Sequence, residues 1–231
     1  IVINLDLSDF FPTIGFGRVR GFFESLGYSP AVATIFALLC TEPPRRKVVY
    51  DGVTYWVAVG DRGLPQGACT SPAISNLISR KLDRRLSGMT RKMGWTYTRY
   101  ADDLTFSAEL QDVGEGKKGR KDLGMLLARI RHVVTEEGFA INPKKGRIQH
   151  AGGRQEVTGI VVNDKLAMPR EEVRKLRAIL HQAKKTGLEA QNREKIPHFE
   201  SYLKGKIAYL NMVDPDRALQ LAKAYMEAGG R

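Results

Sequence analysis

Hydrophobic and polar residues alternate along the first eleven residues, IVINLDLSDFF. Ile1, Ile3, Leu5 and Leu7 fall on one side of an extended chain, and Asp6 falls on the other. A period of two predicts a β-strand, and it places the Asp6 carboxylate on the face opposite the apolar residues. Because the chain opens in mid-strand, without a cap or linker, we expect it to be part of a longer protein.

Other segments also have strand patterns. KVVYDG and VTYWVAVG predict two strands joined by a turn at Asp51-Gly52, a pair typical of tight hairpins. A second hairpin is predicted over Trp95–Ser107. Two later strand-like runs are FAINPKKGRI and QEVTGIVVN.

The sequence predicts a helix that starts at Ser71-Pro72, as N-cap and first helical residue, followed by apolar residues at helical spacing: Ile74, Leu77, Ile78 and Leu82. A polar loop is expected at 109–121. The same spacing predicts further helices at Gly17–Leu26, Pro30–Cys40, Asp122–Glu137, Pro169–Lys185, His198–Met212 and from Asp214-Pro215 onward.

Composition narrows the class of protein. With 231 residues and 42% hydrophobic content, the chain can bury the core of one large or two small domains. It has no apolar run long enough to cross a bilayer and no signal-peptide pattern. Two cysteines give no disulfide framework or zinc spacing. We therefore expect a cytoplasmic protein without a membrane partner, and its net charge of +12 favours a polyanion such as nucleic acid.

The segment TRYADDLTFS places Asp102 and Asp103 side by side in the predicted hairpin turn. An acidic pair in a turn is often only a solvated turn pair. Together with Asp6, however, the pair supplies three carboxylates on one predicted sheet, and divalent cations would relieve their mutual repulsion. Two such cations stabilise the attacking and leaving oxygens of a phosphoryl transfer.

The ordered motifs LDLSDFF, GLPQGACTSP, YADD, GFAINPKK and VTG resemble the palm motifs of reverse transcriptases, most closely the retron type of bacteria, with group II intron-like enzymes next. The resemblance covers nearly the whole chain. It implies an RNA-directed DNA polymerase that uses two Mg²⁺ ions, with Mn²⁺ as an alternative, and extends a primer with dNTPs on an RNA template. In the retron type the product is a small RNA-linked DNA.

The resemblance also assigns residue roles. It makes Asp6, Asp102 and Asp103 catalytic, with the Leu7 carbonyl as a further metal ligand and Lys145 as the proton donor to departing pyrophosphate. The implied nucleotide-binding residues are Asp9, Phe10, Phe11, Gln66 and Gly67, where Phe11 is the steric gate against a ribose 2′-hydroxyl. The implied primer grip is Val157, Thr158 and Gly159.

The implied fold is α+β: a right-hand polymerase palm, with a ferredoxin-like antiparallel sheet and helices, at 1–162, including a fingers-derived segment at about 16–63, and a helical thumb at 163–231. We expect the N-terminal fingers to be absent from this stretch of the protein, and an Asn-Ala-x-x-His motif that many retron enzymes have does not occur in the sequence. The implied partners are the RNA template, a DNA or RNA primer, a dedicated structured non-coding RNA and an effector protein of antiviral defence.

The predicted helix at Pro169–Lys185 carries cations opposite its apolar residues, a face suited to tracking a nucleic-acid backbone or merely to solubility. The candidate nucleic-acid-binding residues are Arg170, Arg174, Arg177, Lys184 and Lys185. Three alternatives stay open: another class of defence-associated reverse transcriptase, a non-catalytic RNA-binding module, and a two-metal nuclease.

Overall fold

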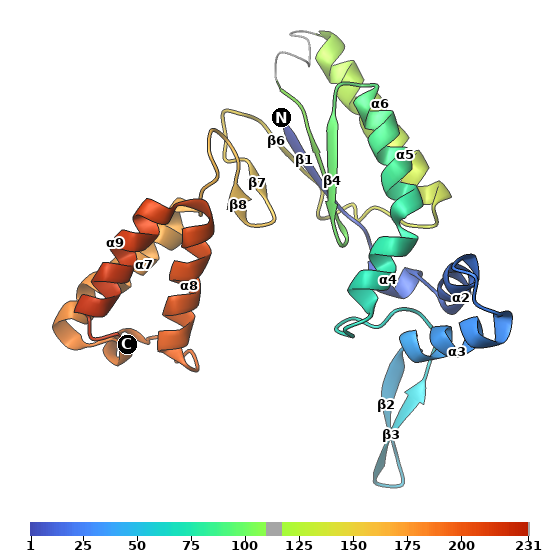
Figure 1. Cartoon of the computed structure of the whole chain (residues 1–231), viewed down its shortest axis with the longest axis horizontal. Helices are drawn as coiled ribbons and strands as arrows, with labels where there is room; N and C mark the ends of the chain where they lie inside the picture. The colour runs from blue at the N-terminus through green and yellow to red at the C-terminus, as the bar shows by residue number, and fades with distance from the viewer. Residues whose placement is uncertain (110–116, 231) are drawn as a thin grey trace. The chain divides into compact units, whose positions relative to one another are not determined.

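The computed structural model describes residues 1–109 and 117–230, and it divides into two compact units, Ile1–Ile148 and Gln149–Arg231 (Figure 1). Residues 149–162, which the sequence analysis assigned to the palm, pack with the second unit. The first unit combines helices with a sheet and the second is mainly helical, so the expected mixture of helices and sheets is present.

A four-stranded sheet organises the first unit, in the order β4-β5-β1-β6. β1 pairs antiparallel with β5, and β5 pairs antiparallel with β4. The strands are β1 (Val2–Asp6), β4 (Thr96–Tyr100), β5 (Asp103–Ser107) and β6 (Arg147–Gln149). The predicted first strand thus ends at Asp6, and the chain turns into a short helix instead of continuing to Phe11.

The apolar face of this sheet is covered by helices α5 (Arg80–Arg91) and α6 (Lys117–Glu136), which run alongside it (Figure 1). Ile3 lies opposite Phe106 and Leu5 opposite Leu104, so both strands direct apolar side chains to one face. The buried side chains that complete this core are Leu82, Leu86, Leu126, Ile130 and Val134. Each such side chain contributes about 1.5–3 kcal/mol relative to exposure.

Four shorter helices precede α5: α1 (Phe10–Thr13), α2 (Phe16–Ser25), α3 (Pro30–Cys40) and α4 (Ser71–Ile78). The expectation for the last of these was wrong in two respects. Thr70, not Ser71, is the N-cap. The helix also stops before Ser79, so α4 and α5 are separate helices.

The predicted Asp51-Gly52 turn is confirmed. It joins β2 (Arg45–Tyr50) to β3 (Val53–Ala58) in a two-stranded sheet. Asp51 has φ 49° and Gly52 has φ 75°, the left-handed conformations that a type I′ hairpin requires. All residues of both strands are exposed, and the hairpin projects away from the helices beside it (Figure 1).

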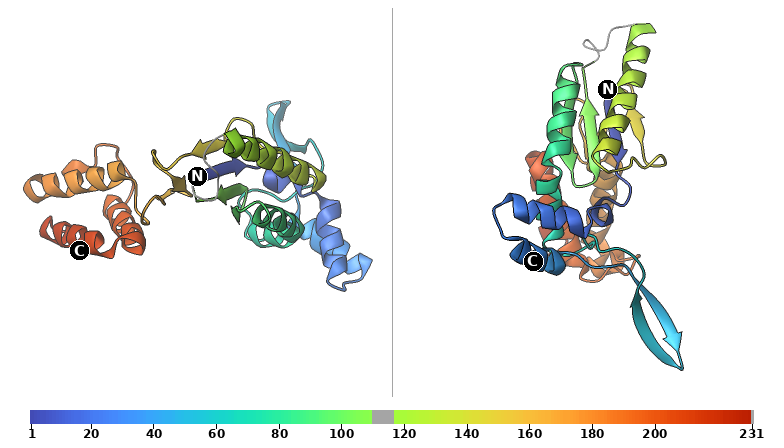
Figure 2. Two further views of the ribbon diagram at one scale, coloured as in Figure 1. Left: turned by 90° about the horizontal axis from the view of Figure 1, so that it is seen from above. Right: turned by 90° about the vertical axis from the view of Figure 1, so that its right-hand side faces the viewer.

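The second unit contains one small hairpin and the C-terminal helices (Figure 2). Its elements are β7 (Glu156–Val157), β8 (Ile160–Val161), α7 (Arg170–Thr186), the 3₁₀ helix η1 (Glu189–Gln191), α8 (Phe199–Val213) and α9 (Pro215–Glu227). Asp214 caps α9 as predicted, accepting a hydrogen bond from the Arg217 amide at 3.2 Å. QEVTGIVVN is not one strand but two, joined by a turn at Thr158-Gly159.

Helix α6 begins at Lys117, where a loop was expected, while residues 110–116 of that loop lie outside the described part of the chain. FAINPKKGRI is mostly irregular: Ile141 forms a single bridge to Leu7, and regular pairing begins only at Arg147. No helix in the described ranges is both long enough and apolar enough to span a bilayer.

Candidate active site

Strand register brings two of the predicted acids together. Asp6 is the last residue of β1, Asp103 is the first of β5, and the two lie directly opposite each other. Directly opposed residues on antiparallel strands project to the same face. The next polar pair on that face is Asn4 and Thr105, whose side chains hydrogen-bond at 3.3 Å. Asp6 therefore lies on the polar face of the sheet, as the alternation in the sequence predicted.

Asp6 is buried, with 6% exposure, and both of its carboxylate oxygens are occupied. Oδ1 accepts from Lys145 Nζ at 2.9 Å, and Oδ2 accepts from Asn142 Nδ2 at 3.2 Å. The backbone amide of Asn142 also donates to the backbone carbonyl of Asp6 at 2.7 Å. A buried carboxylate needs such partners, since an unpaired one would be strongly destabilising.

The turn that carries Asp102 is fixed to the end of β1. The Leu7 amide donates to the Asp102 carbonyl at 3.0 Å, so both acidic segments meet through backbone as well as register. Ala101, directly before Asp102, has φ 52°. A left-handed conformation is unfavourable for alanine, so contacts around the turn must hold it in place.

The electrostatics of the site follow from this crowding. Partial burial, followed by repulsion from Asp102 and Asp6, raises the pKa of Asp103 above its ordinary value, and Lys145 opposes that rise. The hydrogen bond and attraction of Asp6 raise the pKa of Lys145. The site thus carries more negative charge than its own lysine neutralises, and it keeps that lysine protonated.

A hard divalent cation would suit these donors, because carboxylate oxygens are its preferred ligands and because it would relieve the repulsion felt by Asp103. Among the side chains that the structure describes, at 1–109 and 123–230, no group of three acidic, histidine or cysteine residues is arranged to hold a metal ion. In this arrangement both oxygens of Asp6 face Lys145 and Asn142. The donor chemistry fits a metal, and coordination requires Asp6 to give up part of that pairing.

The predicted nucleotide loop, Leu64–Gly67, leads toward helix α4. Gln66 and Gly67 are both exposed, and Gly67 has φ 89°. The Ser71 hydroxyl, at the start of α4, donates to the Pro65 carbonyl at 2.7 Å and anchors the loop. Gln66 also borders a cavity of about 500 Å³ together with Pro12 and Trp56. An exposed amide beside a cavity is available for a ligand.

The residues after β1 have different surroundings. Phe10 is 2% exposed and packs against Phe139 at 5.5 Å between ring centroids, so its side chain serves the core instead of facing a nucleotide. Phe11 is only partly buried and meets the Phe10 ring edge-on at 5.3 Å. Asp9 is exposed, with φ 47°, and its carbonyl accepts from the Thr13 amide at 2.9 Å. Phe11 and Asp9 thus keep the exposure that a nucleotide contact needs.

The other predicted residues belong to the second unit. Thr158 and Gly159, with φ 48° and 85°, form the turn between β7 and β8 that follows Val157. The five candidate cations of α7 are all exposed. One of them, Lys184, pairs with Glu227 of α9, so it is less available for phosphate than the sequence suggested.

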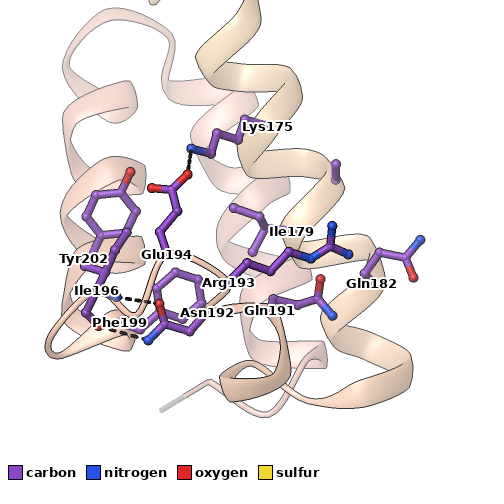
Figure 3. A pocket seen from close by; sticks show the side chains of 11 residues that line it. Lys175, Ile179, Gln182, Gln191, Asn192, Arg193, Glu194, Ile196, Phe199 and Tyr202 are labelled. Atoms are coloured by element: carbon purple, nitrogen blue, oxygen red, sulfur yellow. Dashed lines mark hydrogen bonds and ion pairs between the residues drawn. The ribbon is translucent and has the colours of Figure 1, made fainter.

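A cavity of about 240 Å³ also lies in the second unit, between α7, the connection after it and α8 (Figure 3). Phe199 and Tyr202 line it from α8 with nearly parallel rings. Lys175 and Glu194 form an ion pair at its edge, 2.7 Å between Nζ and Oε1. None of the site residues predicted from the sequence lines this cavity.

Sequence reasoning assigned no role to Asn142, although the structure places it against Asp6. Its side-chain oxygen also accepts from the Lys144 amide at 3.0 Å, which shapes the turn that presents Lys145. An asparagine directly before Pro143 is a common turn former. That pattern could have indicated the turn, but not the partner.

Comparison with known proteins agrees with the motifs. The chain is 45% identical to the Retron Mx65 reverse transcriptase of Myxococcus xanthus, over 96% of this chain and 48% of that protein. It is 42% identical to the Retron Mx162 reverse transcriptase of the same organism, over 93% and 45%. Against the Retron Ec86 reverse transcriptase of Escherichia coli the identity is 35%, over 78% and 48%. The chain spans about half the length of these relatives.

The family described as reverse transcriptase (RNA-dependent DNA polymerase) matches residues 1–199. That range contains the Asp6, Asp102-Asp103 and Lys145 cluster and ends at the first residue of α8. Since the match takes in most of the chain and all of the carboxylate site, the protein belongs to the reverse transcriptase family.

Proposed function

We propose that the full protein is an RNA-directed DNA polymerase of the retron type, which makes a small RNA-linked DNA. The observation that carries this proposal is the meeting of Asp6 and Asp103 across the β1–β5 register, with Asp102 tied to the same strand end. This occurs in a chain whose family copies RNA into DNA and whose relatives are retron enzymes.

In this proposal Asp6, Asp102, Asp103 and the Leu7 carbonyl hold two Mg²⁺ ions, or Mn²⁺ in their place. When bound, these ions would lower the barrier by stabilising charge on the attacking and departing oxygens. Lys145 stays protonated beside Asp6, and its ammonium is available to give a proton to the pyrophosphate that leaves. Asn142 donates to one oxygen of the Asp6 carboxylate and thereby helps to orient it.

The dNTP would lie against Phe11, Asp9 and the Gln66-Gly67 loop. Phe11 offers a ring edge with no hydrogen-bonding group, so a ribose 2′-hydroxyl there would lose water without gaining a partner. Gln66 can contact a base or sugar without adding charge, and Gly67 lets the backbone come close.

We assign a palm to 1–162 with a fingers-derived segment at about 16–63, and a thumb to 163–231. Val157–Gly159 would grip the primer end, and the α7 cations would contact the backbone of the template duplex or of a dedicated structured RNA. Exposed Arg174 and Arg177 lie three residues apart and thus on one side of α7.

We also propose that the full protein is cytoplasmic and has an effector partner in antiviral defence.

A primer-extension assay with Mg²⁺, on matched RNA and DNA templates, tests the proposal. Asp102→Asn should abolish dNTP incorporation and leave template affinity within a few-fold, because affinity comes mainly from cations on phosphates. Asp51→Asn is the matched control, since it makes the same change in a tight turn that tolerates asparagine. Cleavage of the template without extension would indicate a nuclease, and binding without either reaction an RNA-binding module.

A further inference from the structure

Arg99 in β4 has a buried guanidinium, with only 6% of its side chain exposed. Its Nε and Nη2 each donate at 2.8 Å to one oxygen of Asp83 on α5. Such a two-point pairing fixes the plane of the guanidinium as well as its position. Asp83 also accepts from the Tyr97 hydroxyl at 2.8 Å, so the acceptor itself is held from two sides.

The third nitrogen of Arg99 reaches the catalytic turn. Nη1 donates to the Ala101 carbonyl at 3.0 Å and to Asn76 Oδ1 at 3.1 Å. Ala101 is the residue with the unfavourable left-handed backbone, and Asp102 follows it directly. Asn76 belongs to α4, the helix that the Gln66-Gly67 loop leads into. One side chain thus joins α4, α5 and the turn.

Only arginine can make this set of contacts. Its planar fork offers five N–H donors in fixed directions, whereas lysine has a single nitrogen that cannot bind a carboxylate at two points and a carbonyl on the far side. The guanidinium also lies over the Phe10 ring, 5.8 Å from its centroid, and that ring is itself buried in the core. The Phe10 ring therefore contacts one face of the guanidinium, while hydrogen bonds hold its edges.

We propose that Arg99 is the positioning residue of the active site, holding the Ala101–Asp103 turn at a fixed place against α4 and α5. Strand pairing places Asp103 opposite Asp6 and Tyr100, and the turn itself is held further by the Leu7 amide from β1 and by the Arg99 guanidinium from β4. The catalytic consequence rests on the proposed function, which gives Asp102 and Asp103 their role. The structural claim about the turn does not.

Hydrogen exchange of the Leu7 amide tests the structural claim without any catalysis, because that amide donates to the Asp102 carbonyl. Arg99→Gln should accelerate its exchange about tenfold, the effect of losing roughly one hydrogen bond, and leave the core amides of Leu104 and Phe106 unchanged. If Arg99→Gln does not fold, Arg99→Lys, which keeps the charge, takes its place in the experiment and should show the same pattern.

The matched control is Arg85→Gln. Arg85 also makes two ion pairs from α5, to Glu136 and Glu137, but it touches no part of the turn. It should lower the urea midpoint and leave Leu7 exchange within twofold of wild type. Equal acceleration at Leu7, Leu104 and Phe106 in the Arg99 variants would reduce Arg99 to a general stabiliser, and unchanged Leu7 exchange would overturn the proposal outright.

Primer extension and Mn²⁺ titration of the same variants separate this proposal from the proposed function. If wild type extends primers, Arg99→Lys should lower kcat and weaken Mn²⁺ binding about tenfold, with template affinity within twofold, because no surface cation has changed. Wild-type rates and Mn²⁺ affinity in Arg99→Lys would refute the positioning role. If wild type extends no primer, the proposed function fails, and the Leu7 exchange result still decides the role of Arg99 in the turn.

Discussion

The glycine at position 63 permits a close approach of two backbone segments next to the proposed nucleotide loop. Gly63 exchanges two hydrogen bonds with Glu42, at 2.9 and 3.2 Å, and the following Leu64 amide donates to the Ile14 carbonyl at 3.1 Å. These contacts hold the start of the Leu64–Gly67 loop between two other segments. Gly63→Ala places a methyl group where they meet.

The size of the effect follows from the space available. A Cβ at Gly63 would lie 2.4 Å from the Pro12 carbonyl oxygen and 3.0 Å from the Pro12 carbonyl carbon and Cα. Carbon and oxygen atoms normally stay about 3.3 Å apart or more, so a backbone segment must move by roughly 1 Å. Overpacking of this kind costs about 1–3 kcal/mol, and the lost pairing with Glu42 would add to it.

Urea unfolding measures this cost, and Gly21→Ala provides the control. Gly21 lies in α2, is exposed, and would have no atom within 4 Å of an added Cβ. Alanine should stabilise that helix by about 0.5–1 kcal/mol. The two identical substitutions should therefore change the free energy of unfolding in opposite directions.

Gly63→Ala should also raise KM for the dNTP more than it lowers affinity for template, because the displaced loop carries Gln66. If Gly63→Ala were as stable as wild type and bound dNTP normally, the close approach to Pro12 would not constrain the chain, and our reasoning about this loop would be wrong.

Three further outcomes are expected. Phe11→Ala should raise ribonucleotide incorporation relative to deoxynucleotide in single-turnover assays, and unchanged sugar selectivity in the folded variant would return Phe11 to the core. Replacing Arg174 and Arg177 with Gln should make the slope of log K for template binding against log[salt] shallower by roughly one unit per lost phosphate contact. An unchanged slope would show that these side chains are solvated and contact no phosphate. The hydrogen bond from Arg85 lowers the pKa of Glu136 below its ordinary value of 4.5. In acid the unfolded chain therefore binds more protons at Glu136 than the folded chain does. The stability that this ion pair contributes is fully present above pH 4.5 and is lost as the pH falls through the pKa of the folded state. The difference in urea midpoint between wild type and Arg85→Gln should shrink accordingly between pH 6 and pH 3, and a constant difference would contradict this.

Local patterns were sufficient for much of the secondary structure and for the carboxylates. Alternation alone placed Asp6 on the polar face, because side chains of a strand point to opposite sides in turn. Asp51-Gly52 identified a hairpin, since few other pairs adopt two left-handed conformations in succession. The helix Pro30–Cys40 was predicted to the residue, because Pro30 fits a first helical turn. The ordered motifs identified the family.

The tertiary structure decided which groups meet across long separations. Asn142 and Lys145 lie more than 130 positions from Asp6, and no local pattern specifies that both oxygens of one carboxylate end on them. Arg99 likewise binds Asn76 and Asp83, which lie 23 and 16 positions away, and Lys184 pairs with Glu227, 43 positions away. Backbone preferences act over a few residues, whereas the burial and pairing of charges depend on which distant residues the fold places next to each charge. The sequence therefore determined the elements and the acids, and packing determined how those acids are held.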